Sequence, residues 1–232
     1  MIIGLCGFIG DGKDAAAEQL HKMGFKRASF AHALKDAVAA IFHWDRELLE
    51  GFTDASRAWR ELVDPWWANR LGVPCLTPRW VLQHFGLGVC REHLHDEIWI
   101  ASLERRLGAI DGDVVISDAR FPNELDMIKA SGGIVVRVVR GVEPPWLSVA
   151  LAANAGDADA QKVLDSQAIH RSETAWVGYP CDHVVQNDGT LDDLKAKLAS
   201  LIGPRGCPSR WQLMLGTWMH KSCWNPKRYT GR

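Results

Sequence analysis

The sequence lacks the features that would place it in a membrane or on an export route. It has no apolar run near the ~20 residues that a membrane span needs. The first residues also lack the basic start and cleavage site of a signal peptide. Its 232 residues are 47% hydrophobic and 24% charged, which is typical of a globular protein with a sizeable core. We therefore expect a cytoplasmic protein without a membrane partner.

The sequence also lacks the cysteine spacing of a disulfide framework or a zinc finger. None of its 6 cysteines forms a CxxC pair, so we interpret them as reduced thiols. One cluster leaves a metal site open as an alternative, and it consists of His84, Cys90, His93 and His95. No second ligand pair follows at finger-like spacing, which weighs against zinc.

The segment 203–232 contains no Asp or Glu, although it has six basic residues. It also contains Trp211, Trp218 and Trp224, together with several prolines. Three interpretations remain open: a packed extension, a contact with an acidic partner, and a nucleic-acid arm. The density of tryptophan favours packing, because such side chains favour burial. A nucleic-acid partner is therefore not expected.

Strand-like and helix-like segments alternate along the chain, which favours a mostly parallel α/β sheet. The predicted strands are 2–6, 25–29, 113–117, 134–139 and 183–186. The predicted helices are 13–23, 30–42, a helix capped by Thr77, 97–107, a helix from Pro122 to the Gly132-Gly133 pair, and one capped by Thr190 with Asp193. We expect an irregular, Trp-rich insertion at 44–76 and a long, partly helical excursion at 141–182.

The first predicted strand runs directly into a glycine loop with the spacing Gly-x4-Gly-Lys. The loop contains Gly7, Gly10, Asp11 and Gly12, and it ends at Lys13, where an Ala-rich helix begins. Glycines let backbone N–H groups converge on phosphate oxygens, and the helix N-terminus adds a partial positive charge. Lys13 would reach the β- and γ-phosphates. The loop therefore predicts a nucleoside triphosphate site.

Two carboxylates are candidates for a Mg²⁺ site. Asp14 stands where such loops normally have the Ser or Thr that coordinates Mg²⁺, and an anion there is favourable only near a cation. The alternative is a favourable charge at the first turn of the helix. Asp118 ends the apolar strand 113–117, where P-loop proteins keep a carboxylate near the metal. The alternative there is an Asp that begins a turn.

Several arginines are candidates for binding a second phosphate group. Phosphotransfer between two nucleotides needs cations, because two polyanions must be brought into line. Arg79 begins a helix with Gln83 one turn later, Arg91 follows a break at Gly86–Gly88, and Arg120 lies two residues beyond Asp118. Arg137, Arg140 and Arg171 border or lie within the 141–182 excursion. Each alone could be a surface charge, but together they favour a phosphate-binding group.

The sequence resembles the bacteriophage-type deoxynucleoside monophosphate kinases, relatives of dephospho-CoA kinase. The resemblance covers residues 1 to about 202 and depends on "GFIGDGKD", "SFAHALKDAV", "TPRWVLQHFGLGVCR", "VVISDARFPNELDMIKASGGIVVRVVR", "HRSETAW" and "VVQNDGTLDDL". It implies a three-layer P-loop NTPase fold with a five-stranded sheet. It also implies an NMP-binding region, a lid at about 141–182, and Mg²⁺-dependent transfer of the ATP γ-phosphate to a dNMP.

The resemblance also implies roles for individual residues. Lys13, Asp14, Asp118, Arg120 and Arg171 would be catalytic, with Asp14 and Asp118 near Mg²⁺, directly or through water. The loop residues Gly7, Gly10, Asp11 and Gly12 would hold ATP with Lys13 and Asp14, and Asn187 and Gly189 would border the adenine. Lys35, Arg79, Gln83, Arg91, Asp118 and Arg120 would hold the monophosphate. The stretch "FGLGVCR" stands where a Thr-bearing "FGTE"-like stretch is expected, so the choice of monophosphate stays open.

We therefore expect a kinase domain at 1–202 with the insertion 44–76, followed by a C-terminal extension at 203–232. Its partners would be ATP and a dNMP, and a homodimer is one alternative for its oligomeric state. Two other functions stay open. One is a dephospho-CoA kinase-like transfer to a hydroxyl, which would need a base. The other is a nucleotide-binding interaction protein whose basic tail recruits a partner.

Overall fold

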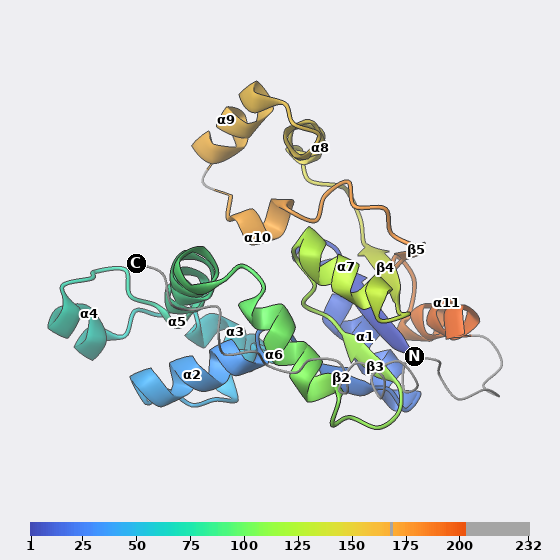
Figure 1. Cartoon of the computed structure of the whole chain (residues 1–232), viewed down its shortest axis with the longest axis horizontal. Helices are drawn as coiled ribbons and strands as arrows, with labels where there is room; N and C mark the ends of the chain where they lie inside the picture. The colour runs from blue at the N-terminus through green and yellow to red at the C-terminus, as the bar shows by residue number, and fades with distance from the viewer. Residues whose placement is uncertain (168, 203–232) are drawn as a thin grey trace, which may run out of the picture.

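The computed structural model describes residues 1–167 and 169–202, so the predicted extension at 203–232 lies outside the described residues. Its centre is a five-stranded sheet in the order β2-β3-β1-β4-β5, with every neighbouring pair parallel (Figure 1). The strands are β1 (Ile2–Cys6), β2 (Lys26–Ala28), β3 (Val114–Ile116), β4 (Ile134–Val139) and β5 (His183–Gln186). The predicted α/β fold with a parallel sheet is confirmed.

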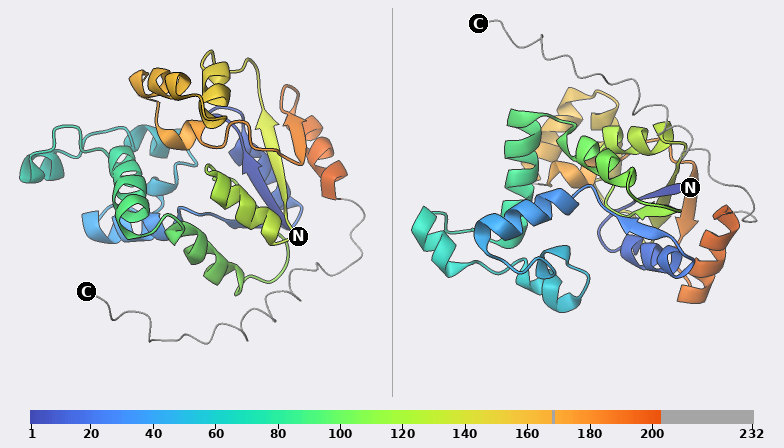
Figure 2. Two further views of the ribbon diagram at one scale, coloured as in Figure 1. Left: turned by 45° about the horizontal axis from the view of Figure 1, so that its top comes forward. Right: turned by 60° about the horizontal axis from the view of Figure 1, so that its bottom comes forward.

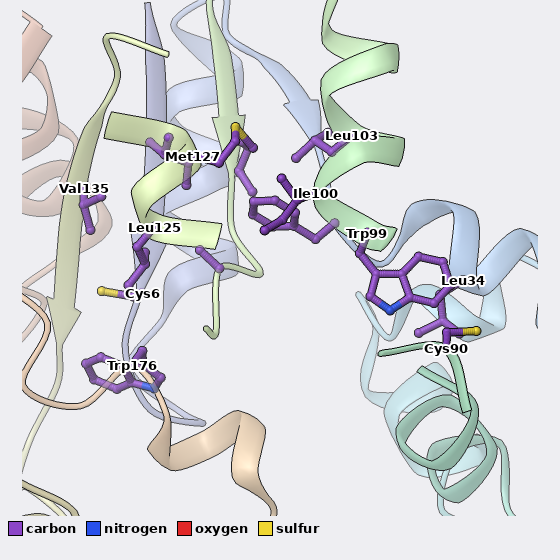
Figure 3. Packing of buried hydrophobic residues seen from close by; sticks show 14 of the residues in the cluster. Cys6, Leu34, Cys90, Trp99, Ile100, Leu103, Leu125, Met127, Val135 and Trp176 are labelled. Carbon is purple, nitrogen blue, oxygen red and sulfur yellow. The ribbon is translucent and has the colours of Figure 1, made fainter. Parts of the chain in front are cut away.

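Helices cover both faces of this sheet, as the two views in Figure 2 show. One face carries α1 (Lys13–Lys22) and α11 (Leu191–Ile202), and the other carries α6 (Ile98–Leu107) and α7 (Pro122–Ala130). Successive side chains of β1 point to opposite faces of the sheet and so contribute to both cores. Ile3 and Leu5 pack under α1, whereas Ile2 and Cys6 pack under α7. Figure 3 shows part of the second core, with Leu125 beside Cys6.

The remaining helices form two groups that project from the sheet in Figure 1. The first group is α2 (His32–Phe42), the 3₁₀ turn η1 (Leu48–Glu50), α3 (Asp54–Trp59), α4 (Pro65–Leu71), α5 (Pro78–Gln83) and η2 (His84–Leu94). The second group is α8 (Leu147–Asn154), α9 (Ala158–Ser166) and α10 (Arg171–Thr174). None of the helices in the described part of the chain combines the length and apolar character that a membrane span requires.

The predicted irregular insertion at 44–76 contains three short helical elements, η1, α3 and α4. Thr53 begins α3 by accepting a hydrogen bond from the Ser56 N–H at 3.1 Å. Asp64 begins α4 by accepting hydrogen bonds from two backbone N–H groups, and its other carboxylate oxygen accepts one from Trp44 Nε1 at 2.8 Å. Each cap satisfies N–H groups that a helix start would otherwise leave unpaired. These short helices therefore depend on local side-chain caps.

The predicted break at Gly86–Gly88 is wrong. The chain continues through both glycines as the π-helix η2, which follows α5 directly. A Cβ at Gly86 would lie 2.7 Å from Leu34 Cδ2, and the Gly86 carbonyl accepts a hydrogen bond from Trp99 Nε1 at 3.0 Å. Gly86 thus permits close packing of α2 and α6 against η2 and does not end the helix.

Other predicted helix ends are confirmed. The Thr77 hydroxyl accepts a hydrogen bond from the Trp80 N–H at 3.1 Å, and Pro78 is the first residue of α5. At α11, Asp193 and Thr190 accept hydrogen bonds from each other's backbone N–H groups. These signals are local in sequence, which is why the pattern alone could predict them.

Candidate active site

The glycine loop follows β1 at the carboxyl edge of the sheet, and its path excludes larger side chains at two positions. Gly7 has φ 147°, and a Cβ there would lie 2.5 Å from the Val138 carbonyl oxygen. Gly12 has φ 88°, and a Cβ there would lie 2.2 Å from Asn187 Nδ2. Both positions combine a left-handed backbone with a close neighbour, so both require glycine.

Asp11 and Asn187 hold the loop in this shape. The Asp11 carboxylate is buried, and it accepts hydrogen bonds from the backbone N–H of Phe8 at 2.6 Å and of Arg140 at 3.3 Å. The Asn187 amide, just beyond β5, donates to the Asp11 carbonyl at 2.9 Å. Two segments that are distant in sequence, after β4 and after β5, therefore fix the loop. The structure brings the predicted Asn187 directly against it.

The Lys13 ammonium group lies inside the loop. It donates to the carbonyl oxygens of Gly7 at 2.9 Å and Phe8 at 2.7 Å. Burial and the nearby charge of Arg120 lower the pKa of Lys13, whereas Glu173, Asp11 and Asp14 act in the opposite direction. The loop therefore holds a cation at the start of α1, where an anionic ligand would also meet the helix N-terminus.

The two predicted metal carboxylates lie in different surroundings. The Asp14 side chain is 61% exposed, with the Ser117 hydroxyl at 3.4 Å and an Arg27 nitrogen at 3.8 Å. Asp118 accepts hydrogen bonds from the Ser29 hydroxyl at 2.6 Å and from the N–H groups of Phe30 and Ala31. Asp14 is thus open to a ligand, whereas Asp118 also fastens β3 to the turn before α2.

Arg120 joins the edge of the sheet to the 141–182 segment. Its guanidinium forms an ion pair with Glu173 on α10. Arg120 and Glu173 both act on the pKa of Lys13, so the structure brings these three charges together with Asp14. Sequence reasoning missed Glu173, because no local pattern shows which remote carboxylate will face Arg120.

Arg60 is a further cation that sequence reasoning missed. Burial and the charges of Arg79 and Arg120 lower its pKa, whereas Glu61 and Asp14 raise it. Its Nε is buried without a hydrogen-bond partner in the described residues, and a Cβ at Gly51 would lie 2.1 Å from its Nη2. Thr53 as a helix cap would have predicted α3 and placed Arg60 at its carboxyl end. Arg79 also pairs with Glu61, and its backbone N–H donates to the Arg60 carbonyl at 2.9 Å.

Two predicted phosphate-binding cations are held by carboxylates. The Arg91 side chain is 3% exposed, and its guanidinium contacts Glu124 and Asp96 and lies over the Phe121 ring at 4.2 Å. Lys35 pairs with Glu50 at 2.5 Å. Both cations therefore have anionic partners in this structure. Their predicted contacts with a monophosphate stay predictions.

The remaining predicted residues lie at the margins of this cluster. Gln83 ends α5 and is half-buried, and Arg171 begins α10 with an exposed side chain. Gly189 lies in the turn before α11, where a Cβ would meet Asp193 Oδ2 at 2.6 Å. Within residues 1–167 and 169–202, no group of three or more His, Cys, Asp or Glu side chains is arranged to hold a metal ion.

A cavity of about 350 Å³ lies beside the glycine loop. Its lining comes from the loop and from the segment that follows β4, and consists of Phe8, Ile9, Gly10, Asp11, Arg140, Val142 and Pro144. Clefts of this size are typical of small-molecule sites. The Gly141 N–H donates to the Asp188 carboxylate at 3.0 Å, which ties this segment to the turn beyond β5.

Comparisons with known proteins find relatives among kinases. A protein of Acanthamoeba polyphaga mimivirus, provisionally named a deoxynucleotide monophosphate kinase, is 32% identical over 155 residues, which cover 60% of this chain and 74% of that protein. The deoxynucleoside-5'-monophosphate kinase of Escherichia phage T5 is 30% identical over 97 residues, which cover 37% of this chain and 39% of that protein. No family model matches the chain.

Similar solved structures are more distant. TT1252 from Thermus thermophilus has a TM-score of 0.44 and 18% identity, covering 89% of this chain and 98% of that one. Dephospho-CoA kinase from Campylobacter jejuni has a TM-score of 0.38 and 18% identity, covering 87% of this chain and 95% of that one.

The parallel sheet, with a glycine loop and lysine between its central strand and α1, defines a P-loop nucleotide-binding protein. The identity to the mimivirus protein then gives the family: the chain belongs to the deoxynucleotide monophosphate kinases. It is therefore an enzyme, a phosphotransferase that acts on nucleotides.

Proposed function

We propose that the protein transfers the γ-phosphoryl group of ATP to a deoxynucleoside monophosphate, giving ADP and a deoxynucleoside diphosphate, with Mg²⁺. The observation that carries this proposal is a group of four cations that act on one another: besides burial, Arg120 lowers the pKa of both Lys13 and Arg60, and Arg79 lowers that of Arg60. These cations are Lys13 in the glycine loop, and Arg60, Arg79 and Arg120 from three other segments. One triphosphate needs the loop and its lysine, and the extra arginines suit a second phosphate opposite it.

The ATP end of the proposed site lies at the glycine loop. Backbone N–H groups of the loop and the Lys13 ammonium would bind the phosphates. The cavity beside the loop, between Ile9 and Arg140, suits the nucleoside part of ATP. Asn187 and Gly189 would border the adenine, because the turn beyond β5 packs directly on the loop.

The monophosphate end would be formed by the arginines. The unpartnered Nε of Arg60 supports this role, since a buried donor without an acceptor is costly unless a ligand satisfies it. Arg79 and Arg120 are paired with Glu61 and Glu173, and a phosphate dianion would compete with those carboxylates. Lys35, Gln83 and Arg91 stay proposed neighbours of the same substrate.

The residues at the start of α1 fit a Mg²⁺ ion bound with the triphosphate. Mg²⁺ prefers oxygen ligands and usually keeps several waters and substrate phosphates in its shell. Asp14 offers a largely exposed carboxylate, and Asp118 has three hydrogen-bond donors in place, which leaves capacity for a water. Asp14 and Asp118 would hold the ion directly or through water, and its positive charge would offset that of the phosphates.

The chain's own residues would act mainly by positioning and by electrostatics. Lys13 would exchange its two loop carbonyls for phosphate oxygens, and Arg120 would face the group in transit. The acceptor is already a phosphate dianion, so no strong general base is required. Transfer would be direct and in line, without a covalent enzyme intermediate.

The domain boundaries belong to the same proposal. Residues 1–202 would form the kinase domain, with 44–76 near the monophosphate and 141–182 as a lid that carries Arg171 and Glu173. Closure of the lid would exclude water and suppress hydrolysis of ATP. The extension at 203–232 would be an appendage to this domain.

A coupled assay of ADP release tests the proposal. It compares dAMP, dGMP, dCMP and dTMP with their ribonucleotide counterparts and with dephospho-CoA, each with ATP and with or without Mg²⁺. We expect ADP release that depends on at least one dNMP, requires Mg²⁺ and exceeds the rate with dephospho-CoA. A rate that no dNMP changes would contradict the proposal.

A further inference from the structure

Two thiols that are distant in sequence meet beside the glycine loop. Cys6 Sγ lies 3.5 Å from Cys181 Sγ, although 175 residues separate them in sequence. Cys6 is the last residue of β1 and directly precedes Gly7. Cys181 lies at the end of the 141–182 segment, between α10 and β5.

The two thiols differ in access and in charge environment. Cys6 is fully buried, and Figure 3 shows it between Leu125 and Trp176. Cys181 is partly exposed. The hydrogen bond with the Cys6 thiol and the charges of Arg137 and Lys129 lower the pKa of Cys181, whereas burial and Asp182 oppose them. The same hydrogen bond and burial raise the pKa of the Cys6 thiol.

This arrangement is that of a reactive thiol with a neighbouring resolving thiol. A partly exposed cysteine beside cations is the kind that oxidants attack, because the thiolate is the nucleophile. The buried partner is within reach of the product, since a disulfide needs the sulfurs to approach by only about 1.5 Å more. Within the described residues, Cys75 and Cys90 are free thiols that have no such pairing.

We propose that Cys6 and Cys181 form a redox pair that slows phosphotransfer when a hydroperoxide oxidises it. The Cys181 thiolate attacks the peroxide, forming a sulfenic acid and releasing the alcohol, or water if the oxidant is hydrogen peroxide. The Cys6 thiol then attacks that sulfur, forming the disulfide and releasing water. The two thiols lose two electrons and two protons, which the peroxide takes up.

The disulfide would act on the glycine loop through its entry. Cys6 is joined to Gly7, whose φ of 147° and contact with the Val138 carbonyl leave little room for displacement. On the other side, Cys181 is joined to Asp182, which binds Val135 of β4 through its carboxylate and its N–H. The crosslink would therefore tie the end of the 141–182 segment to β1, the strand that leads into the loop. A misplacement of about 1 Å at a catalytic site can cost about a hundredfold in rate.

The test treats the full chain with hydrogen peroxide, blocks remaining thiols with an alkylating reagent, and maps linked peptides by mass spectrometry. We expect a Cys6–Cys181 crosslink and at least a roughly tenfold fall in kcat that dithiothreitol reverses. The measurement of kcat depends on the proposed kinase reaction, but the peptide map does not. Failure of the proposed function can therefore be distinguished from failure of the redox pair.

Two variants separate this pair from general oxidation. Before oxidation, Cys181→Ser should have the wild-type kcat. After treatment with peroxide, it should show neither the crosslink nor the fall in kcat that dithiothreitol reverses. Cys75→Ser, which removes an exposed thiol, should behave as wild type in both states. A crosslink without slower turnover would overturn the regulatory inference. Oxidation of Cys75 while Cys6 and Cys181 both remain alkylatable would overturn the pair itself.

Discussion

At the scale of single residues, the site depends on cations whose charges are only partly compensated. Lys13 donates to two loop carbonyls and has a lowered pKa, caused by burial and by Arg120. Arg60 has a buried Nε without a partner in the described part of the chain. An incoming polyanion would satisfy both groups, so substrate binding and local electrostatics are linked.

The lowered pKa of Lys13 predicts the alkaline limb of the pH profile. The free enzyme should lose this cation at a lower pH than an ordinary lysine would. Bound phosphates favour the charged form and should raise the pKa again. As pH rises, kcat/KM for ATP should therefore fall before kcat does. A pH-rate series checks this, and superimposed alkaline limbs would contradict it.

Two substitutions at Lys13 complete this test. Lys13→Ala should lose most of kcat, roughly a hundredfold or more, because it removes charge stabilisation of the transferring group. Lys13→Arg carries a guanidinium that does not deprotonate in this range, so its residual activity should lack the early alkaline fall. If the alkaline limb were unchanged in Lys13→Arg, a group other than Lys13 would be responsible for it.

Arg60→Ala should raise KM for the monophosphate about tenfold to a hundredfold, because charge-assisted hydrogen bonds contribute about 1.5–3 kcal/mol each. KM for ATP should change little. The matched control is Arg70→Ala, which removes an exposed arginine of α4 in the same 44–76 region. Steady-state kinetics with both substrates varied measure the effect. Equal acceptor constants in the two variants would remove Arg60 from the site.

At the scale of elements, sequence predicted best what local patterns determine. The predicted bounds of β4 and β5 are those observed. The path from β1 through the glycine loop to α1 could be predicted from the apolar run, the spacing of the glycines and the Ala-rich sequence of the helix. The short helices of 44–76 were missed, although Thr53 and Asp64 are local caps. These helices have only 6 and 7 residues, and they pack through tryptophans that are apart in sequence, such as Trp44 with Trp59 at 5.9 Å.

The candidate site divides in the same way. The loop residues and Asp14 lie in one motif, so the sequence could single them out. The pairing of Arg120 with Glu173 joins residues that are 53 positions apart, and the burial of Arg91 against Glu124 depends on the packing of η2 against α7. No local pattern determines which carboxylate a given arginine will meet.

The glycine loop allows a matched pair of substitutions. Gly10 and Gly12 both have positive φ, but a Cβ at Gly10 meets nothing within 4 Å, whereas one at Gly12 meets Asn187 Nδ2 at 2.2 Å. Gly10→Ala should cost about 1–2 kcal/mol of backbone strain. Gly12→Ala should cost more and should also raise KM for ATP. Denaturant unfolding and kinetics check this.

The double variant Gly12→Ala with Asn187→Ala sharpens that prediction. Removing the Asn187 amide relieves the clash with the new Cβ. The loss of unfolding free energy in the double variant should therefore be smaller than the sum of the losses in the two single variants. Additive costs, or equal effects of Gly10→Ala and Gly12→Ala, would contradict the proposed contact as the cause.

At the scale of the whole molecule, the ion pair of Arg120 with Glu173 joins the 141–182 segment to the edge of the sheet beyond β3. Glu173 on α10 is mostly buried and pairs with Arg120, which follows β3. In the proposed reaction a phosphate would take the place of this carboxylate. The ion pair thus stabilises the unliganded enzyme, and the substrate phosphate must displace Glu173 from Arg120 in order to bind.

Glu173→Gln should weaken that competition. We expect KM for the monophosphate to fall by roughly fivefold, the value of about 1 kcal/mol for a partly exposed ion pair. The matched control is Asp159→Asn, which weakens an exposed pair with Lys162 on α9 of the same segment. A higher KM in Glu173→Gln would show that Glu173 assists binding and does not compete with it.

The central claim is that one nucleotide lies at the glycine loop while the arginines hold a second phosphate in line with it. The most direct measurement is the dissociation constant of a bisubstrate ligand, an adenosine joined through a chain of five phosphates to a deoxynucleoside, determined by calorimetry. We predict binding at least a hundredfold tighter than that of ATP or the dNMP alone, since one ligand would occupy both sites. Both Lys13→Ala and Arg60→Ala should lose that gain. Binding no tighter than that of ATP, and unaffected by Arg60→Ala, would contradict the account.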